Sequence, residues 1–181
     1  MPLIEVNGDL LDATEPVIVQ QLNCLCVRGH GLAASIAERF PYADVYGARR
    51  ALGNRNLAIP EDRGVPGEIV VSYPDTASPN KISESPIIIG LYGQFDYGKP
   101  DGYKYIKRTT TKQDNYELRV KWFTEALAKL KIWLIDNQIS AVAFPYGIGC
   151  GLAGGDWKIY SKLLKDFAEH APYKVVIYKL E

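Results

Sequence analysis

The sequence has no long apolar run and no excess of charge of either sign. Its 21 Lys and Arg residues equal its 21 Asp and Glu residues, so composition predicts neither a polyanion-binding surface nor a membrane-surface site. Apolar runs such as Val17 to Val19 and Ile87 to Ile89 are short and strand-like, and no run is long enough to span a bilayer. The first residues hold no basic segment followed by an apolar one, so we expect no signal peptide and no membrane partner.

Cysteine is scarce as well, with only Cys24, Cys26 and Cys150. An odd number of thiols, in a chain long enough to bury a core without disulfides, predicts a reducing, cytoplasmic location in a cell or in a cell that hosts a virus. The three thiols and His30 have the chemistry of a zinc site, but the C-x-C spacing is tighter than the usual zinc patterns, so we expect no metal and no cofactor. The length favours one domain, residues 1–181.

Apolar periodicity predicts a sheet flanked by helices. Helices are expected from Leu32 to Phe40 and from Asp114 to Asp136, where apolar residues recur in steps of three and four. A further helix is expected to bury an apolar face made of Trp157, Ile159, Leu163, Leu164 and Phe167. Strands are expected at Leu3–Val6, Val17–Leu22, Gly67–Tyr73, Pro86–Tyr92, Ala141–Phe144 and Tyr173–Leu180. Because strands and helices alternate in the second half, we expect an α/β fold: a three-layer α/β/α sandwich with a mixed, mostly parallel central sheet.

One segment, Gly93 to Gln113, has no apolar period and is long for a connection in a small domain, at about twenty residues. It holds four aromatic residues, and from Lys99 to Lys112 it has five basic residues against one acidic residue. Two interpretations stay open: the segment folds over a ligand site, or it forms a β-hairpin that extends the sheet edge.

Two glycine-containing loops each follow a predicted strand and precede a predicted helix. The first lies between Gln20 and Ala33, and the second holds five glycines from Gly147 to Gly155. Such a density of glycine indicates main chain in unusual dihedrals or close to a ligand, and N–H groups at a helix start hold anions. Parallel strands place both loops at one sheet edge, where they can bind a diphosphate from two sides.

The second loop contains a G-x-G-x-x-G pattern from Gly149 to Gly154, so a dinucleotide-binding fold has to be weighed. That pattern normally opens a domain and is followed by further βα units, whereas only about thirty residues remain here. The acidic residue expected to bind the ribose hydroxyls is also missing, unless Glu181 serves. The pattern therefore favours a phosphate site of another kind.

Four motifs in order resemble the macro domain, the ADP-ribose-binding module. They are Gly8-Asp9-Leu10 after the first strand, Asn23 before a Gly-x-Gly helix start, Phe-Pro-x-Gly-Ile-Gly-Cys-Gly-Leu from Phe144, and Tyr178 near the end. The resemblance covers nearly the whole chain and is greatest to small stand-alone macro proteins that process ADP-ribose 1″-phosphate or remove ADP-ribose from macromolecules.

The resemblance implies roles for individual residues. Asp9 would accept a hydrogen bond from the adenine amino group, Tyr178 would pack on the adenine, and Asn23 would bind the distal ribose. Main-chain amides of both glycine loops would surround the phosphates. The full expected ligand-binding set is Gly8, Asp9, Leu10, Gln21, Asn23, Gly29, His30, Gly31, Leu32, Gln94, Tyr97, Tyr146, Gly147, Ile148, Gly149, Cys150, Gly151, Leu152 and Tyr178.

The candidate catalytic residues are His30, Asn23 and Asp156. His30 can act as a base or as a donor to a terminal phosphate, or it can be a helix-start histidine that faces water. Asp156 can activate water or simply cap the helix after it. Ala153 stands where relatives that cleave ADP-ribosyl esters carry an Asp, no Lys falls between Gly67 and Pro74, and the His that phosphatase-type relatives place near Gln20 is absent.

We therefore expect a hydrolase that binds ADP-ribose and removes a modification of its distal ribose, with ADP-ribose 1″-phosphate as the leading substrate. The first alternative is a non-catalytic reader of ADP-ribose or of ADP-ribosylated macromolecules. The second is a glycohydrolase that removes ADP-ribose from protein or nucleic acid, with the basic stretch Lys99 to Lys112 as its contact. Nucleic acid is expected as a partner only in that modified form.

Overall fold

A computed structural model of the chain describes residues 3–74, 84–100 and 114–181. Its strands form one six-stranded sheet in the order β1-β6-β5-β2-β4-β3. Every neighbouring pair is parallel except β3 and β4, which are antiparallel. The predicted mixed, mostly parallel sheet is thus confirmed, with strands β1 (Leu3–Asn7), β2 (Val17–Asn23), β3 (Ile69–Ser72), β4 (Ile87–Gln94), β5 (Ala141–Pro145) and β6 (Lys174–Lys179).

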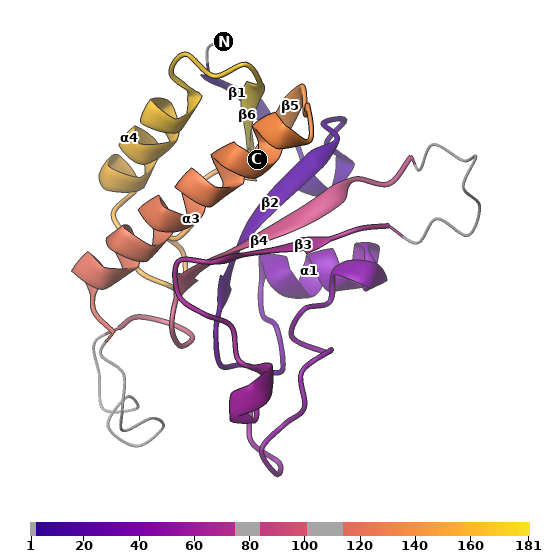
Figure 1. The fold of residues 1–181 in the computed structure, drawn as a ribbon, viewed down its shortest axis with the longest axis vertical. Coiled ribbons are helices and arrows are strands. Elements are labelled where there is room, and N and C mark those ends of the chain that lie inside the picture. Colours follow the sequence, from indigo (N-terminus) through magenta and orange to yellow (C-terminus); the bar gives the residue numbers. More distant parts are fainter. Residues whose placement is uncertain (1–2, 75–83, 101–113) are drawn as a thin grey trace.

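Helices cover both faces of this sheet, as predicted. Helix α1 (Leu32–Arg39) lies on one face, and α3 (Tyr116–Asp136) and α4 (Trp157–Ala168) lie on the other (Figure 1). Three short 3₁₀ helices, η1 (Leu10–Asp12), η2 (Pro41–Ala43) and η3 (Pro60–Asp62), occur in the connections. Among the described residues, no helix has the length and apolar character needed to cross a membrane.

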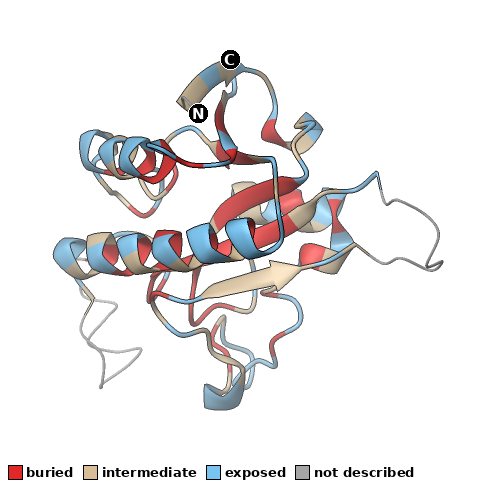
Figure 2. Ribbon diagram, turned by 45° about the horizontal axis from the view of Figure 1, so that its top comes forward, coloured by how far each residue is buried: buried red, intermediate tan, exposed pale blue. Residues whose placement is uncertain are grey.

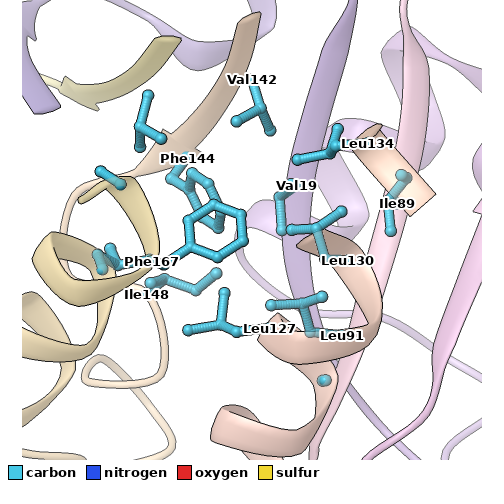
Figure 3. Packing of buried hydrophobic residues seen from close by; sticks show 14 of the residues in the cluster. Val19, Ile89, Leu91, Leu127, Leu130, Leu134, Val142, Phe144, Ile148 and Phe167 are labelled. Atoms are coloured by element: carbon cyan, nitrogen blue, oxygen red, sulfur yellow. The ribbon is translucent and has the colours of Figure 1, made fainter. Parts of the chain in front are cut away.

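Helix α3 packs on the sheet by the stripe that its sequence predicts. Asn115 caps its start by accepting a hydrogen bond from the Leu118 amide at 2.8 Å. The buried residues Leu127, Leu130 and Leu134 then recur in steps of three and four and pack against β2 and β4 (Figure 3). Trp122 is also buried, in a neighbouring apolar cluster, so its role is packing.

Helix α4 buries most of its predicted apolar face: Leu164 and Phe167 are buried, and Trp157 and Leu163 pack against the core, but Ile159 does not. Ile159 was expected to face the core, but it is 45% exposed, whereas Tyr160 is buried. The spacing of Tyr160, Leu164 and Phe167 is the i, i+4, i+7 spacing of one helix face, and Ile159 lies one residue outside it. Phe167 meets Phe144 of β5 edge-on, with ring centroids 5.7 Å apart.

The central strands are apolar because both of their faces are covered. Val17 and Val19 of β2 pack on the α3 and α4 side, and Ile18 between them packs with Ile36 of α1. Figure 2 shows the resulting buried centre of the sheet. Since β1, β6, β5, β2 and β4 run parallel, their carboxyl ends meet at one edge, and the connections that follow them gather there.

The long aperiodic segment is only partly described. Strand β4 extends into it as far as Gln94, and residues 95–100 follow. Residues 101–113, which contain Tyr103 and Tyr105 and most of the basic stretch, lie outside the described residues. The choice between a cover for the site and a β-hairpin stays a prediction for that part.

We predict that Phe144→Ala lowers the free energy of unfolding by about 3–5 kcal/mol, because the ring has no exposed surface and its loss leaves a cavity in the core. The control is Ile132→Ala on the outer face of α3, which is 61% exposed and should change stability by less than about 0.5 kcal/mol. Urea denaturation measures both values. Equal losses would contradict this description of the core.

Candidate functional site

A pocket with a volume of about 730 Å³ opens at the carboxyl edge of the sheet. Its walls come from residues that end or follow β1, β6, β5, β2 and β4, so it runs along the ends of all five parallel strands. Neighbouring strands lie about 4.8 Å apart, and four such spacings give a length of roughly 19 Å. The pocket is therefore suited to a long, narrow ligand.

The structure brings most of the predicted ligand-binding residues together in this pocket. Gly29, Cys150 and Asp156 are the predicted residues that do not line it. Those that do are Gly8, Asp9, Leu10, Gln21, Asn23, His30, Gly31, Leu32, Gln94, Tyr97, Tyr146, Gly147, Ile148, Gly149, Gly151, Leu152 and Tyr178. Lining residues that the motifs did not indicate include Arg28, Tyr46 and Lys179.

A carboxylate and an aromatic ring lie together at the β1 and β6 end of the pocket. One oxygen of Asp9 accepts a hydrogen bond from the Leu11 amide at 2.9 Å and caps η1. The Tyr178 ring lies against Gly8, and its hydroxyl donates to Glu15 at 2.7 Å. Burial and this hydrogen bond raise the pKa of Tyr178, so the phenol stays neutral near pH 7. This end offers an acceptor beside a flat apolar surface.

The second glycine loop supplies main-chain donors along the middle of the pocket. Gly147 and Gly149 have φ values of 73° and 78°, a region that favours glycine. The Cys150 amide donates to the Gly147 carbonyl at 2.8 Å and closes the turn. Within the described part of the chain, no hydrogen bond is made by the amides of Gly147, Gly149, Gly151 and Leu152. Four open N–H donors remain for a ligand.

The start of α1 faces the same pocket from the first glycine loop. Gly31, with a φ of 56°, precedes the helix and has no side chain to cap it, so first-turn amides such as that of Leu32 stay available. Arg28 and His30 are exposed and also line the pocket. Helix dipole, open amides and a guanidinium thus favour negative charge here.

Asn23 lies at the end of β2, and its side chain is already partly used by its own loop. Its carboxamide oxygen accepts from the amides of Leu25 at 3.1 Å and Cys26 at 2.8 Å. Its main-chain N–H donates to the Tyr46 hydroxyl at 2.8 Å, and burial raises the pKa of Tyr46. The amide nitrogen has no partner among the residues that the structure describes. Asn23 can donate to a ligand but cannot take a proton from one.

A chain of amides fixes the wall next to β4. Gln21 donates from its amide nitrogen to the Gln94 carboxamide oxygen at 2.6 Å, and Gln94 donates to the main-chain oxygen of Asp96 at 3.0 Å. Tyr97 follows, partly exposed, at the pocket. The part of the aperiodic segment that is described thus borders the pocket.

Two buried arginines support the loops around the pocket, and the motif search missed both. Arg49 donates to the carbonyls of Asn23 at 3.0 Å and Cys26 at 2.7 Å, and its guanidinium lies 5.0 Å from the centre of the Tyr46 ring. Arg119, on α3, is paired with Asp114. Arg119 stands four residues before Phe123 and so lies on the same helix face as the apolar stripe. An arginine on that face is the feature of the sequence that could have indicated a buried, paired side chain.

Two predicted residues serve the loop rather than the pocket. Asp156 accepts a hydrogen bond from the Lys158 amide at 2.9 Å and caps α4, so its position supports the capping alternative and not a catalytic role. Burial, and then the charge of Asp156, raise the pKa of Cys150 to about 11, which keeps the thiol protonated at neutral pH. Across the described ranges, no three His, Cys, Asp or Glu residues form a group that could hold a metal ion.

No protein-family model and no curated protein sequence matches the chain. Solved structures do. The macrodomain of Mycobacterium tuberculosis DarG is 21% identical, with a TM-score of 0.62 over 97% of this chain and 96% of that one. Thermosipho africanus DarTG in complex with ADP-ribose is 18% identical, with a TM-score of 0.67 over 98% of this chain and 41% of that one.

A macrodomain mutant of Oceanobacillus iheyensis with ADPR is 17% identical, with a TM-score of 0.59 over 97% of this chain and 83% of that one. At sequence identities of 17–21%, this structural similarity shows a shared fold and nothing more. The protein has the macro domain fold, as its motifs predicted.

We predict that Gly149→Ala lowers the free energy of unfolding by about 1–3 kcal/mol, because its φ is 78° and an added Cβ would lie 2.5 Å from Cε1 of the buried Tyr160. Gly151→Ala is the matched control, since no atom lies within 4 Å of its added Cβ, and its stability should change by less than about 0.5 kcal/mol. Chemical denaturation compares the two. A larger loss for the control would refute the assigned loop conformation.

Proposed function

We propose that the pocket binds ADP-ribose. The observation that carries this proposal is the order of groups along the sheet edge: an acceptor and an aromatic ring at one end, open amides in the middle, and an amide donor beyond them. Adenine, diphosphate and a second ribose need those groups in that order. Two similar structures, with sequence identities of 18% and 17%, were solved with this ligand.

In the proposed complex, the open oxygen of Asp9 accepts from the adenine amino group and Tyr178 packs on the ring. The diphosphate takes the open amides of the second glycine loop and those at the start of α1, with Arg28 as a counter-charge. The amide nitrogen of Asn23 donates to the distal ribose. No metal is needed to hold the phosphates, since main-chain donors surround them.

We further propose hydrolysis at the distal ribose, with ADP-ribose 1″-phosphate as the leading substrate. A water oxygen attacks phosphorus while the bond from phosphorus to the 1″ oxygen breaks, and inorganic phosphate and ADP-ribose leave. His30 takes the proton of the attacking water, and loop amides hold the phosphoryl oxygens. The ribose oxygen receives a proton from solvent. With one exposed base and no metal, positioning supplies most of the rate.

A non-catalytic reader is the second candidate, and three observations favour it. Ala153 lines the pocket where an acid would be needed for ester cleavage. The oxygen of Asn23 is engaged in its loop, and Asp156 caps α4 outside the pocket. A reader would keep the whole binding arrangement and lack only turnover.

ADP-ribose should bind more tightly than AMP by at least about tenfold, because AMP lacks the second phosphate and the ribose that meet the open amides and Asn23. Isothermal titration calorimetry measures both dissociation constants. Absence of ADP-ribose binding at high micromolar concentration would overturn the proposed function.

Phosphate release from ADP-ribose 1″-phosphate should fall by about 10²-fold or more in His30→Ala, since a general base contributes about that factor. His170→Asn is the control: it changes the other histidine, which is exposed and lies outside the pocket, and asparagine tolerates its φ of 56°. A colorimetric phosphate assay gives both rates. No release by the unchanged protein would leave the reader as the function.

A further inference from the structure

Arg119 is a charged residue with only 2% of its surface exposed, close to the start of α3. Its Nε donates to one oxygen of Asp114 at 2.8 Å, and its Nη2 donates to the other oxygen at 2.9 Å. This is the two-point geometry in which arginine binds carboxylates best. The Asp114 side chain has no exposed surface, so the pair is buried as a unit.

The same guanidinium donates to three main-chain carbonyls. Nη1 donates to Gly98 at 2.5 Å and to Ala153 at 3.1 Å, and Nη2 donates to Asp96 at 3.2 Å. Together with the two bonds to Asp114, these account for all five N–H donors of the side chain. Such a complete set of partners shows that this position needs the arginine fork and not only a positive charge.

The three carbonyls belong to two separate walls of the pocket. Gly98 lies beyond the end of β4, Ala153 lies in the loop after β5, and both line the pocket. In the sheet, β2 lies between β5 and β4. Arg119 therefore connects the walls on either side of Asn23, which ends β2, although it does not line the pocket itself.

We propose that Arg119 is a positioning residue that sets the separation of these two walls and thereby the preference for ligands with a second ribose. This inference rests on the proposed binding of ADP-ribose. The adenosine end of the pocket is formed at β1 and β6, which Arg119 does not contact, so its contribution is confined to the other end.

The test compares ADP-ribose with ADP, which lacks the distal ribose and ends in a free phosphate, in the unchanged protein and in Arg119→Lys. Lysine keeps the charge beside Asp114 but offers three donors from one atom, too few for both walls. ADP-ribose affinity should fall by about tenfold and ADP affinity by less than about twofold. The matched control is Arg50→Lys, an exposed arginine paired with Asp62, which should leave both affinities unchanged.

Calorimetry gives the affinity of each variant for ADP-ribose and for ADP, relative to the affinity of the unchanged protein. Thermal unfolding shows whether each variant is folded. A purely structural role would weaken both ligands in parallel, and a parallel loss or no loss would overturn the inference. If the unchanged protein binds ADP-ribose no better than ADP, the inference fails while nucleotide binding stands. If it binds neither, the proposed function itself fails.

A second variant covers the case in which Arg119→Lys does not fold. The double change Asp114→Leu with Arg119→Met removes both charges and leaves no unpaired carboxylate in the core. It should fold and show the same selective loss for ADP-ribose over ADP. If this variant prefers ADP-ribose over ADP as strongly as the unchanged protein does, the positioning role is also overturned.

Discussion

The pocket depends on main-chain amides that have no hydrogen-bond partner among the residues that the structure describes. Open amides serve a ligand only if the backbone around them is held in place by other means, because glycine-containing loops have many accessible conformations. Arg49 and Arg119 supply that support from the carbonyl side of the same loops. The Arg49 guanidinium donates to two carbonyls, and the Arg119 guanidinium donates to three carbonyls and a carboxylate, more than the two N–H donors of a neutral side-chain amide allow.

This support also explains why charged residues occur inside an otherwise apolar fold. A buried arginine is strongly destabilising unless its donors are satisfied. For Arg119 the carboxylate of Asp114 balances the charge and three carbonyls take the remaining donors. For Arg49 the balance comes from two carbonyls and the faces of Tyr46 and Tyr92. Both sites therefore combine folding stability with the shape of the pocket.

The helices and strands of the fold could be predicted from the sequence because their apolar residues follow the spacing of a helix or of a buried strand. The stripe of α3 and the doubly buried β2 follow from spacing alone, and each was placed correctly. Helix α4 shows the limit: Ile159 and Tyr160 are adjacent and both suit an apolar face, and only the packing against Phe123 selects the tyrosine. Adjacent apolar residues leave the phase of a short helix undetermined.

Only those residues of the site that belong to a sequence motif could be predicted from the sequence. Asp9, Asn23 and the second glycine loop stand at fixed places after strands, so sequence order alone brings them to one edge. Arg119 reaches carbonyls that lie more than twenty positions away on either side, at Asp96 and Ala153. Carbonyl acceptors have no signature in a sequence, so such contacts need the folded chain.

The engaged groups narrow the chemistry that this pocket can perform. The oxygen of Asn23 is held by two amides of its own loop, Asp156 is held by the start of α4, and burial keeps the Cys150 thiol protonated. The Asn23 oxygen and the Cys150 thiol are thus engaged where a base or nucleophile would have to be free, and Asp156 does not line the pocket. Among the candidate catalytic residues named by the sequence, His30 lines the pocket and carries an imidazole, the side chain that acts most often as a general base. Beyond the contribution of this base, any turnover depends on the geometry that the loops impose on the substrate, and the same buried arginines that stabilise the fold hold these loops.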